Sequence, residues 1–207
     1  YDSDDAVLIP EYSLFIISPK LEWSYDTRDK IFDPTSGYFI NSHIMGSIKS
    51  DISDATYYKF EVEGGYIIPV DDYIVGLKAS FGTLNIKDGF VPPSYRFFAG
   101  GMHSNRAYGY RKLGPTDSRN NPMGSESILE ATAEIRFDIY GGLRGVLFSD
   151  NTYLGNESMP SYDNGYYSAG FGLRYKTPIG PIAIDLGFDI QNPTKQYAIH
   201  FHIGELF

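Results

Sequence analysis

Hydrophobic and polar residues alternate with a period of two along most of the chain. The alternation is most regular in the C-terminal third, where residues 167–175, 182–190 and 197–203 each carry an apolar side chain at every second position. Successive side chains of a β-strand point to opposite faces of its sheet, so these stretches predict strands with one apolar and one polar face. The period of an amphipathic helix, about 3.6 residues, fits nowhere for more than a few residues. The pattern therefore predicts an all-β protein.

The same alternation continues, less strictly, through the rest of the chain and gives about nine strands in all. The further predicted strands lie at residues 20–26, 38–47, 58–66, 73–82, 131–139 and 144–153. Most strands run for about 9 to 14 residues, long enough to cross a bilayer at the tilt of a barrel strand. A tenth strand before Pro10 has a weaker pattern.

The connections between the predicted strands fall into two classes. Residues 69–72 and 178–181 form tight turns, whereas residues 88–127 and 155–164 form long polar loops. Short turns on one rim and long loops on the other are typical of outer-membrane barrels. The alternative, a soluble sandwich, would have strands of about 5 or 6 residues whose polar face meets water. Long strands, and a polar face with glycines and charges of both signs that suit a wet lumen, favour the antiparallel transmembrane β-barrel.

Composition narrows the function classes. The chain has 207 residues and a formal net charge of −9, so it lacks the positive field that binds a nucleic-acid backbone. Cysteine is absent, which excludes disulfides, thiolate metal sites and a cysteine nucleophile. No apolar run approaches the roughly 20 residues of a membrane-spanning helix. The mean hydropathy of −0.26 fits a soluble protein and a barrel equally, because a barrel shows lipid only every second residue.

The long loop carries the residues that point to a family. It reads Val91-Pro-Pro-Ser-Tyr-Arg-Phe-Phe-Ala-Gly-Gly101, followed by Ser104-Asn-Arg-Ala-Tyr-Gly-Tyr110. This segment resembles the sixth extracellular loop of the outer-membrane assembly-factor superfamily, the BamA/TamA type, and is most similar to the TamA branch. The turns at residues 33–37 and 175–181 and the ending of the chain resemble the same family in the same order. The loop motif residues are Arg96, Phe97, Phe98, Gly100, Gly101 and Tyr108.

The resemblance implies that this chain is one part of a larger barrel. Family barrels have about sixteen strands and follow periplasmic POTRA domains, so residues 1–207, with about 8–10 strands, correspond to the C-terminal half of a barrel without POTRA domains. A chain that begins with Tyr1 rather than Met agrees with a fragment, and the lack of a signal peptide is then uninformative. A small barrel that closes on itself with about 8 or 10 strands is the alternative.

The resemblance also implies a salt bridge between the loop and the lumen. Arg106 corresponds to the arginine of the family's Arg-Gly-aromatic triplet, which folds inward onto carboxylates, and the matching carboxylates are Glu134 and Asp150. The alternation independently places Glu134 on the polar face. A guanidinium paired with carboxylates in a poorly hydrated lumen forms strong, directional hydrogen bonds. A solvated loop arginine near unrelated acids is the alternative. The sequence departs from the triplet at Ala107, whose Cβ would strain a positive φ.

The last strand, expected from Gln196 to Phe207, would by the same analogy form the seam at which the barrel opens. Its motif residues are Tyr197, Ile199, Phe201, Ile203, Gly204 and Phe207. Any lipid-facing strand needs apolar residues at alternate positions, so only the family analogy makes this strand a gate. The first strand of the barrel, which would pair with it, is not recognisable in the sequence.

No catalytic residue, cofactor or metal site is expected. His200 and His202 share the polar face, but a zinc site that includes His43 or His103 has no support from ligand spacing. The sequence contains no phosphate-binding glycine pattern and no Gly-x-Ser-x-Gly elbow of a lipase.

The family analogy gives the leading hypothesis for function. The chain would be the barrel of a TamA-like factor in the bacterial outer membrane that helps to insert or secrete outer-membrane proteins such as autotransporters. The expected partners are outer-membrane lipid, client proteins and a periplasm-spanning protein, and nucleic acid is not among them. Open strand edges cannot face lipid, so a second copy could also pair edge to edge. A two-partner secretion pore, the barrel of a patatin-fused phospholipase, and a small passive channel or outer-membrane enzyme are the alternatives.

Overall fold

The computed structural model describes residues 13–163, 165–205 and 207. Nine antiparallel strands follow one another in chain order within one sheet. The strands are β1 (Lys20–Asp26), β2 (Gly37–Ser47), β3 (Thr56–Val70), β4 (Tyr73–Asp88), β5 (Ser127–Tyr140), β6 (Leu143–Gly155), β7 (Tyr166–Tyr175), β8 (Ile182–Asp189) and β9 (Tyr197–Ile203). One 3₁₀ turn, η1 (Pro93–Tyr95), lies between β4 and β5. Within the described ranges, no helix has the length and apolar character needed to cross a membrane.

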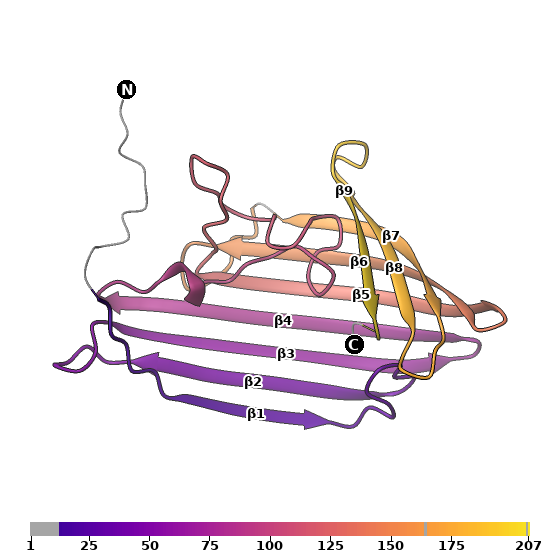
Figure 1. Ribbon diagram of the computed structural model, residues 1–207, viewed down its shortest axis with the longest axis horizontal. Coiled ribbons are helices and arrows are strands. Elements are labelled where there is room, and N and C mark those ends of the chain that lie inside the picture. Colours follow the sequence, from indigo (N-terminus) through magenta and orange to yellow (C-terminus); the bar gives the residue numbers. More distant parts are fainter. Residues whose placement is uncertain (1–12, 164, 206) are drawn as a thin grey trace.

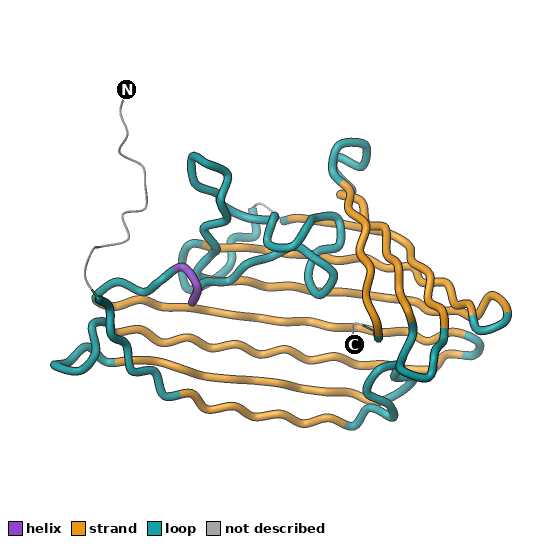
Figure 2. Tube along the Cα trace, viewed as in Figure 1, coloured by secondary structure: helices purple, strands orange, loops and turns teal. Residues whose placement is uncertain are grey.

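The sheet curls, so that β8 and β9 cross at a steep angle to β1–β4 (Figure 1). The loop between β4 and β5 lies over the hollow side of the sheet (Figure 2). Among the described residues, β1 pairs only with β2 and β9 only with β8. The expected all-β antiparallel architecture is confirmed, and nine strands agree with the expected number. The tenth strand considered before Pro10 lies outside the described residues.

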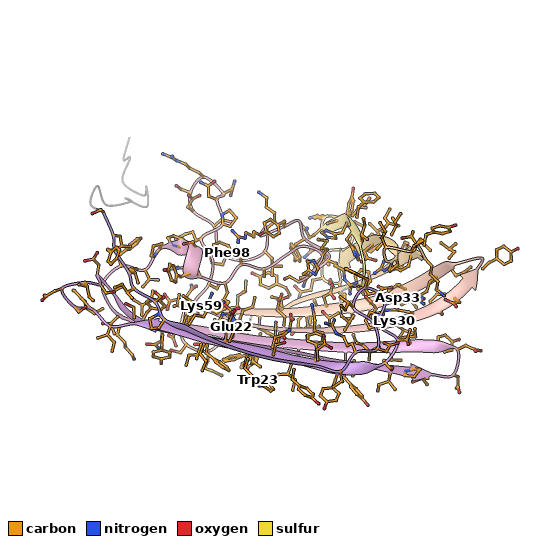
Figure 3. The ribbon with its side chains drawn as sticks, turned by 60° about the horizontal axis from the view of Figure 1, so that its bottom comes forward. Glu22, Trp23, Lys30, Asp33, Lys59 and Phe98 are labelled. Carbon is orange, nitrogen blue, oxygen red and sulfur yellow. The ribbon has the colours of Figure 1, made fainter. Side chains whose placement is uncertain are left out.

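The alternation of residue types separates the two faces of the sheet. In β9 the side chains of Tyr197, Ile199, Phe201 and Ile203 are all more than half exposed, whereas the residues between them face the hollow side. In β1, Trp23 points away from the hollow side and the neighbouring Glu22 lies on it (Figure 3). The face assignment predicted from the period of two is therefore confirmed in these strands.

The inner face is not uniformly polar. Where β3, β4 and β5 approach the long loop, the loop packs an apolar core against the strands. This core consists of Ala55, Tyr57, Leu84, Val91, Phe97, Ala99, Leu113 and Ile128. The expectation of a wet, polar lumen is therefore wrong for this region, because the loop covers the inner face with hydrophobic residues of its own.

The C-terminal end of the chain also departs from expectation. The expected last strand, Gln196 to Phe207, is too long, because β9 ends at Ile203. Gly204 has a φ of +90°, which glycine adopts without strain, and it ends the strand. Phe207 is 2% exposed and packs beside Ile67 of β3 on the inner face. Gly204 and Phe207, which were expected in the seam strand, therefore lie beyond the end of β9.

The turn between β1 and β2 is organised by Asp29. Its carboxylate accepts hydrogen bonds from the backbone and hydroxyl of Thr35, at 2.8 and 2.6 Å, and from the Ser36 amide at 3.1 Å. Burial alone would favour the neutral acid, but these hydrogen bonds outweigh it and lower the pKa of Asp29 from 3.8 to about 2. The turn also brings Asp33 and Pro34 into contact with arginines of the inner face.

We predict that Asp29→Asn destabilises the protein at neutral pH but not near pH 2. A carboxylate whose pKa is depressed by folding stabilises the native state above its unfolded pKa of about 3.9, and this contribution is lost as the pH falls through the folded pKa. The difference in melting temperature between wild type and variant should therefore shrink between about pH 4 and pH 2. Asp72→Asn, in the exposed turn between β3 and β4, is the control. A difference that does not change with pH would contradict the prediction.

Candidate functional site

The tip of the long loop is buried on the inner face of the sheet. Asn105, Arg106 and Ala107 have no exposed surface. The loop folds back on itself at Gly101, whose φ of +115° requires glycine. The Gly101 amide donates to the carbonyl oxygens of Tyr108 at 3.0 Å and Asn105 at 3.3 Å. These hydrogen bonds make the tip a compact unit that presents Arg106 to the strands.

Two residues of the loop motif pack the loop against neighbouring segments. The Phe97 ring covers Gly82 of β4, where a Cβ would come within 2.3 Å of the ring, and the Lys59 ammonium lies 4.5 Å from its centroid. Arg96 forms an ion pair with Glu126 at 3.7 Å, just before β5. Phe97 therefore packs the loop against the sheet, and Arg96 connects the first part of the loop to its end.

Two further motif residues make contacts within the loop. The Arg111 guanidinium lies 4.6 Å from the centroid of the Phe98 ring. The Gly100 amide donates to the Ser104 hydroxyl at 2.9 Å. Phe98 and Gly100 therefore shape the loop itself, and the contacts to the strands are made by other residues.

Arg106 joins the loop to β5 and β6. Its Nη1 lies 2.8 Å from Oε2 of Glu134, and its Nε and Nη2 contact the two carboxylate oxygens of Asp150 at 3.0 and 2.9 Å. The Arg106 backbone amide also donates to Asp150, at 3.0 Å. The guanidinium carbon lies 3.4 Å from the centroid of the Phe148 ring. The structure thus brings together Arg106, Glu134 and Asp150, the residues that the family resemblance groups.

The charge of Arg106 is set by its neighbours. Burial disfavours the charged guanidinium, but the carboxylates of Asp150, Glu134 and Asp185 outweigh it and raise the pKa of Arg106 above its usual range. The Arg106 side chain is fully buried, and those of Glu134 and Asp150 are at most 2% exposed. Removing the cation would therefore leave carboxylates in a site from which water is largely excluded.

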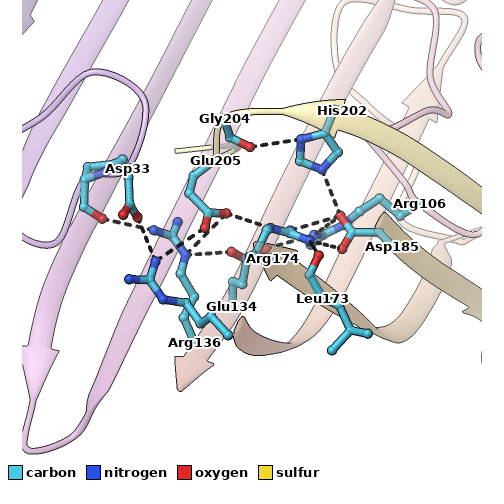
Figure 4. A network of polar contacts seen from close by, with 12 residues as sticks. Asp33, Arg106, Glu134, Arg136, Leu173, Arg174, Asp185, His202, Gly204 and Glu205 are labelled. Atoms are coloured by element: carbon cyan, nitrogen blue, oxygen red, sulfur yellow. Dashed lines mark hydrogen bonds and ion pairs between the residues drawn. The ribbon is translucent and has the colours of Figure 1, made fainter. Parts of the chain in front are cut away.

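Sequence reasoning missed further charged residues of the site. Asp185 of β8 contacts Arg174 at 2.6 and 3.1 Å and Arg106 at 3.4 Å (Figure 4). Arg136 donates to Glu134 at 2.9 Å. The alternation places Arg136 on the polar face two residues after Glu134 and places Asp185 on the polar face of β8, but it does not show which loop residue lies over them. The contact of Asp185 with Arg106 could therefore not be found from the pattern.

The backbone of the loop tip contacts β8, β9 and the connection between them. His200 Nε2 lies 3.1 Å from the Arg106 carbonyl oxygen, and the Gln196 side-chain amide donates to the Ala107 carbonyl oxygen at 2.7 Å. Gly187 of β8 allows this approach, because a Cβ there would lie 2.3 Å from the same Arg106 oxygen. The loop is thus in contact with the last strand as well as with β5 and β6.

Ala107, which stands where the family's triplet has glycine, causes no backbone strain. The non-glycine residues with positive φ within the described ranges are Asp71, Arg111 and Asn120, so Ala107 adopts an ordinary conformation. The aromatic residue after it, Tyr108, donates its hydroxyl to Asp189 at 3.0 Å. Burial and this hydrogen bond raise the pKa of Tyr108, which keeps the phenol neutral.

The chain end occupies the inner face beside the charged residues. The Phe207 ring covers Gly76 of β4, where a Cβ would lie 3.2 Å from it. The guanidinium carbon of Arg136 lies 5.3 Å from the centroid of the same ring. Phe207 therefore closes one side of the charged site, a position that the sequence pattern did not reveal.

Within the described residues, no group of three or more His, Asp or Glu side chains is placed to hold a metal ion. His202 instead contacts Asp185 at 3.2 Å and the Gly204 carbonyl oxygen at 3.0 Å. His200 contacts the loop backbone. Both histidines therefore act as hydrogen-bonding partners of the loop and the chain end.

Comparisons with known proteins give a consistent result. The sequence profile of the Omp85 superfamily domain matches residues 13–207. The chain is similar to outer envelope protein 80, chloroplastic, of Arabidopsis thaliana, with 29% identity over 125 residues that cover 56% of this chain and 15% of that protein. Its fold is similar to the crystal structure of BamA from Haemophilus ducreyi lacking POTRA domains 1–3, with a TM-score of 0.74 and 20% identity. That match covers 89% of this chain and 40% of the BamA chain, so the chain spans less than half of either relative.

We predict that Arg106→Ala lowers the free energy of unfolding by about 3–5 kcal/mol, because the buried carboxylates lose their cation. Arg106→Lys should recover only part of this loss, since an ammonium cannot form the two-pronged contact to Asp150. Urea unfolding of the purified protein in lipid, followed by fluorescence, measures both effects. Lys112→Ala, at an exposed position of the same loop, should change stability by less than about 0.5 kcal/mol. A loss below about 1 kcal/mol for Arg106→Ala would show that the contact contributes little.

Proposed function

Because the chain belongs to the Omp85 superfamily, we propose that it forms the outer-membrane β-barrel portion of a factor that inserts or translocates outer-membrane proteins. The outward face of the sheet supports a barrel wall in lipid, since apolar side chains are exposed at every second position of β9. The match to BamA covers 40% of that chain, so the activity, clients and partners of the whole protein are part of this proposal.

The observation that carries the proposal is the contact of Arg106 with Glu134 and Asp150. Insertion of another protein breaks no covalent bond, so it needs no nucleophile or cofactor. It needs a barrel wall that keeps its shape while one edge stays available for pairing. Arg106 supports such a wall because it ties the long loop to two neighbouring strands from inside.

The edge of β9 meets the second requirement, an edge that is available for pairing. Within the described part of the chain, β9 pairs only with β8, so one row of its backbone N–H and C=O groups has no strand partner. In lipid such groups must be satisfied by another strand. We propose that this edge pairs with the first strand of the complete barrel and exchanges that partner for a strand of the client protein.

The finer assignment is to a TamA-type factor of the bacterial outer membrane. The loop residues Arg96 to Gly101, which read Arg-Phe-Phe-Ala-Gly-Gly, support this branch. Under this assignment the clients include autotransporters, and a periplasm-spanning protein is the partner on the inner side. The outer edges of β1 and β9, which have no strand partner within the described residues, also permit pairing with a second copy of the chain.

The function is tested in cells that depend on the full-length protein for assembly of an autotransporter. We expect Arg106→Ala and Glu134→Lys each to reduce the folded client in the outer membrane several-fold, because both remove the contact that holds the loop. The amount of client domain exposed on the cell surface to added protease measures the effect.

Two controls belong to this experiment. Lys112→Ala should assemble clients at the wild-type level, and immunoblots of each variant correct for differences in its own abundance. Wild-type assembly by both Arg106→Ala and Glu134→Lys would remove the proposed role. Ion conductance in planar bilayers without any effect on assembly would instead indicate a passive channel.

We also predict that a charge on the outward face destabilises the protein according to its depth in the membrane. Leu147 of β6 is 53% exposed and pairs with Ile135 and Phe171, so Leu147→Arg should cost about 2–4 kcal/mol in lipid. Tyr140→Arg, at the turn between β5 and β6, should cost about 0–1 kcal/mol. Unfolding in lipid vesicles measures both values, and equal costs at the two positions would contradict a lipid-facing wall.

A further inference from the structure

Six charged side chains on the inner face form a closed ring of alternating sign (Figure 4). Around the ring, Arg106 contacts Glu134 at 2.8 Å, Glu134 contacts Arg136 at 2.9 Å, Arg136 lies 3.8 Å from Glu205, Glu205 contacts Arg174 at 2.9 Å, Arg174 contacts Asp185 at 2.6 Å, and Asp185 returns to Arg106 at 3.4 Å. All six side chains have no exposed surface. The three arginines and three carboxylates balance each other in charge.

The ring connects the long loop to the chain end, although its members from these two segments, Arg106 and Glu205, are not neighbours in the ring. Arg106 belongs to the long loop, and Glu205 belongs to the chain end that follows β9. Each of them contacts ring members that come from strands, namely Glu134 and Arg136 of β5, Arg174 of β7 and Asp185 of β8. The ring is therefore a physical connection between the loop and the end of the last strand.

The chain end is held by the backbone as well as by Glu205. The Gly204 amide donates to the Pro181 carbonyl oxygen at 2.8 Å, and the Glu205 amide donates to the Phe32 carbonyl oxygen at 2.9 Å. Both amides directly follow β9, which has only one strand neighbour in the described part of the chain. The contacts that fix Glu205 therefore also fix the C-terminal end of β9.

We propose that Glu205 is a positioning residue for β9 and that it is energetically coupled to Arg106 through this ring. Without Arg106 the remaining ring has a net negative charge, which disfavours the Glu205 carboxylate and draws Arg136 and Arg174 toward Glu134 and Asp185. Without Glu205 the ring has a net positive charge, which disfavours Arg106. Each residue thus stabilises the inward position of the other, because a buried charge depends on a balanced set of partners.

The proposal deepens the proposed function and rests on it for its biological meaning, because it gives the loop control over the strand that pairs with clients. Release of the loop would loosen the end of β9, and release of the chain end would loosen the loop. Thermodynamic linkage requires the two effects to be equal in size. This reciprocity distinguishes coupling from local damage around a substituted residue.

The test is hydrogen exchange of the purified full-length protein in lipid nanodiscs. The amides of Gly204 and Glu205 report the chain end, and the Arg106 amide, which donates to Asp150, reports the loop. In Arg106→Ala we expect the two chain-end amides to exchange at least about 5-fold faster, the lower end of typical coupling between two sites. In Glu205→Gln we expect the Arg106 amide to exchange faster by a similar factor.

Milder variants and a control keep the test decisive. Arg106→Lys and Glu205→Asp retain the charges and should produce smaller changes in the same directions, even if the stronger variants fail to fold. Lys112→Ala, in the same loop but outside the ring, should leave the exchange of Gly204 and Glu205 unchanged.

The outcomes separate the coupling from the proposed function. Faster exchange in both directions, relative to the backbone amides of β2 and β3, supports the coupling, whereas an equal increase at all amides, or changes confined to the segment that carries the substitution, overturn it. Client assembly is measured separately on the same variants. Altered exchange with normal client assembly would support the coupling and reject the proposed function. Unaltered exchange with failed client assembly would reject the coupling and support the proposed function.

Discussion

A guanidinium that is withdrawn from water must be paired with anions, and this requirement organises the inner face of the protein. The cost of burying Arg106 is offset only because Glu134, Asp150 and Asp185 approach it from three different strands. A shift of any of these strands by one residue would turn its carboxylate to the outward face. The buried arginine therefore links the position of the loop to the register of the strands, which apolar contacts of the loop could not do with the same specificity.

The loop can approach the strands closely because glycines of the inner face have no side chain. A Cβ at Gly187 would lie 2.3 Å from the Arg106 carbonyl oxygen, and a Cβ at Gly172 would lie 1.9 Å from a carboxylate oxygen of Asp185. Glycine weakens a strand, but here it leaves room for the backbone and charges of other segments. The loss of strand stability at these positions is compensated by the contacts that the space permits.

Much of the architecture could be predicted from sequence because a period of two follows directly from strand geometry. The outward positions of β9, for example Phe201, are exposed as the alternation requires. The grouping of Arg106 with Glu134 and Asp150 needed the family resemblance, since residues 28 and 44 positions apart carry no local signal of contact. The contacts of Asp185 with Arg106 and of Glu205 with Arg136 were missed because a strand pattern does not show where a loop or a chain end lies on the inner face. The inward turn at Gly204 was missed because a strand pattern does not show where a strand stops.

The position of β9 illustrates why a polar network suits an edge strand. A strand in the middle of a sheet is held by hydrogen bonds on both sides, whereas β9 has them on one side within the described residues. Contacts from inside supply part of what the second neighbour would give: Gln196 and His200 to the loop backbone, and His202 to Asp185. These contacts use side chains of the inner face and leave the backbone edge free. An edge strand can therefore be fixed in position and still be open to pairing, provided that its support comes from the hollow side of the sheet.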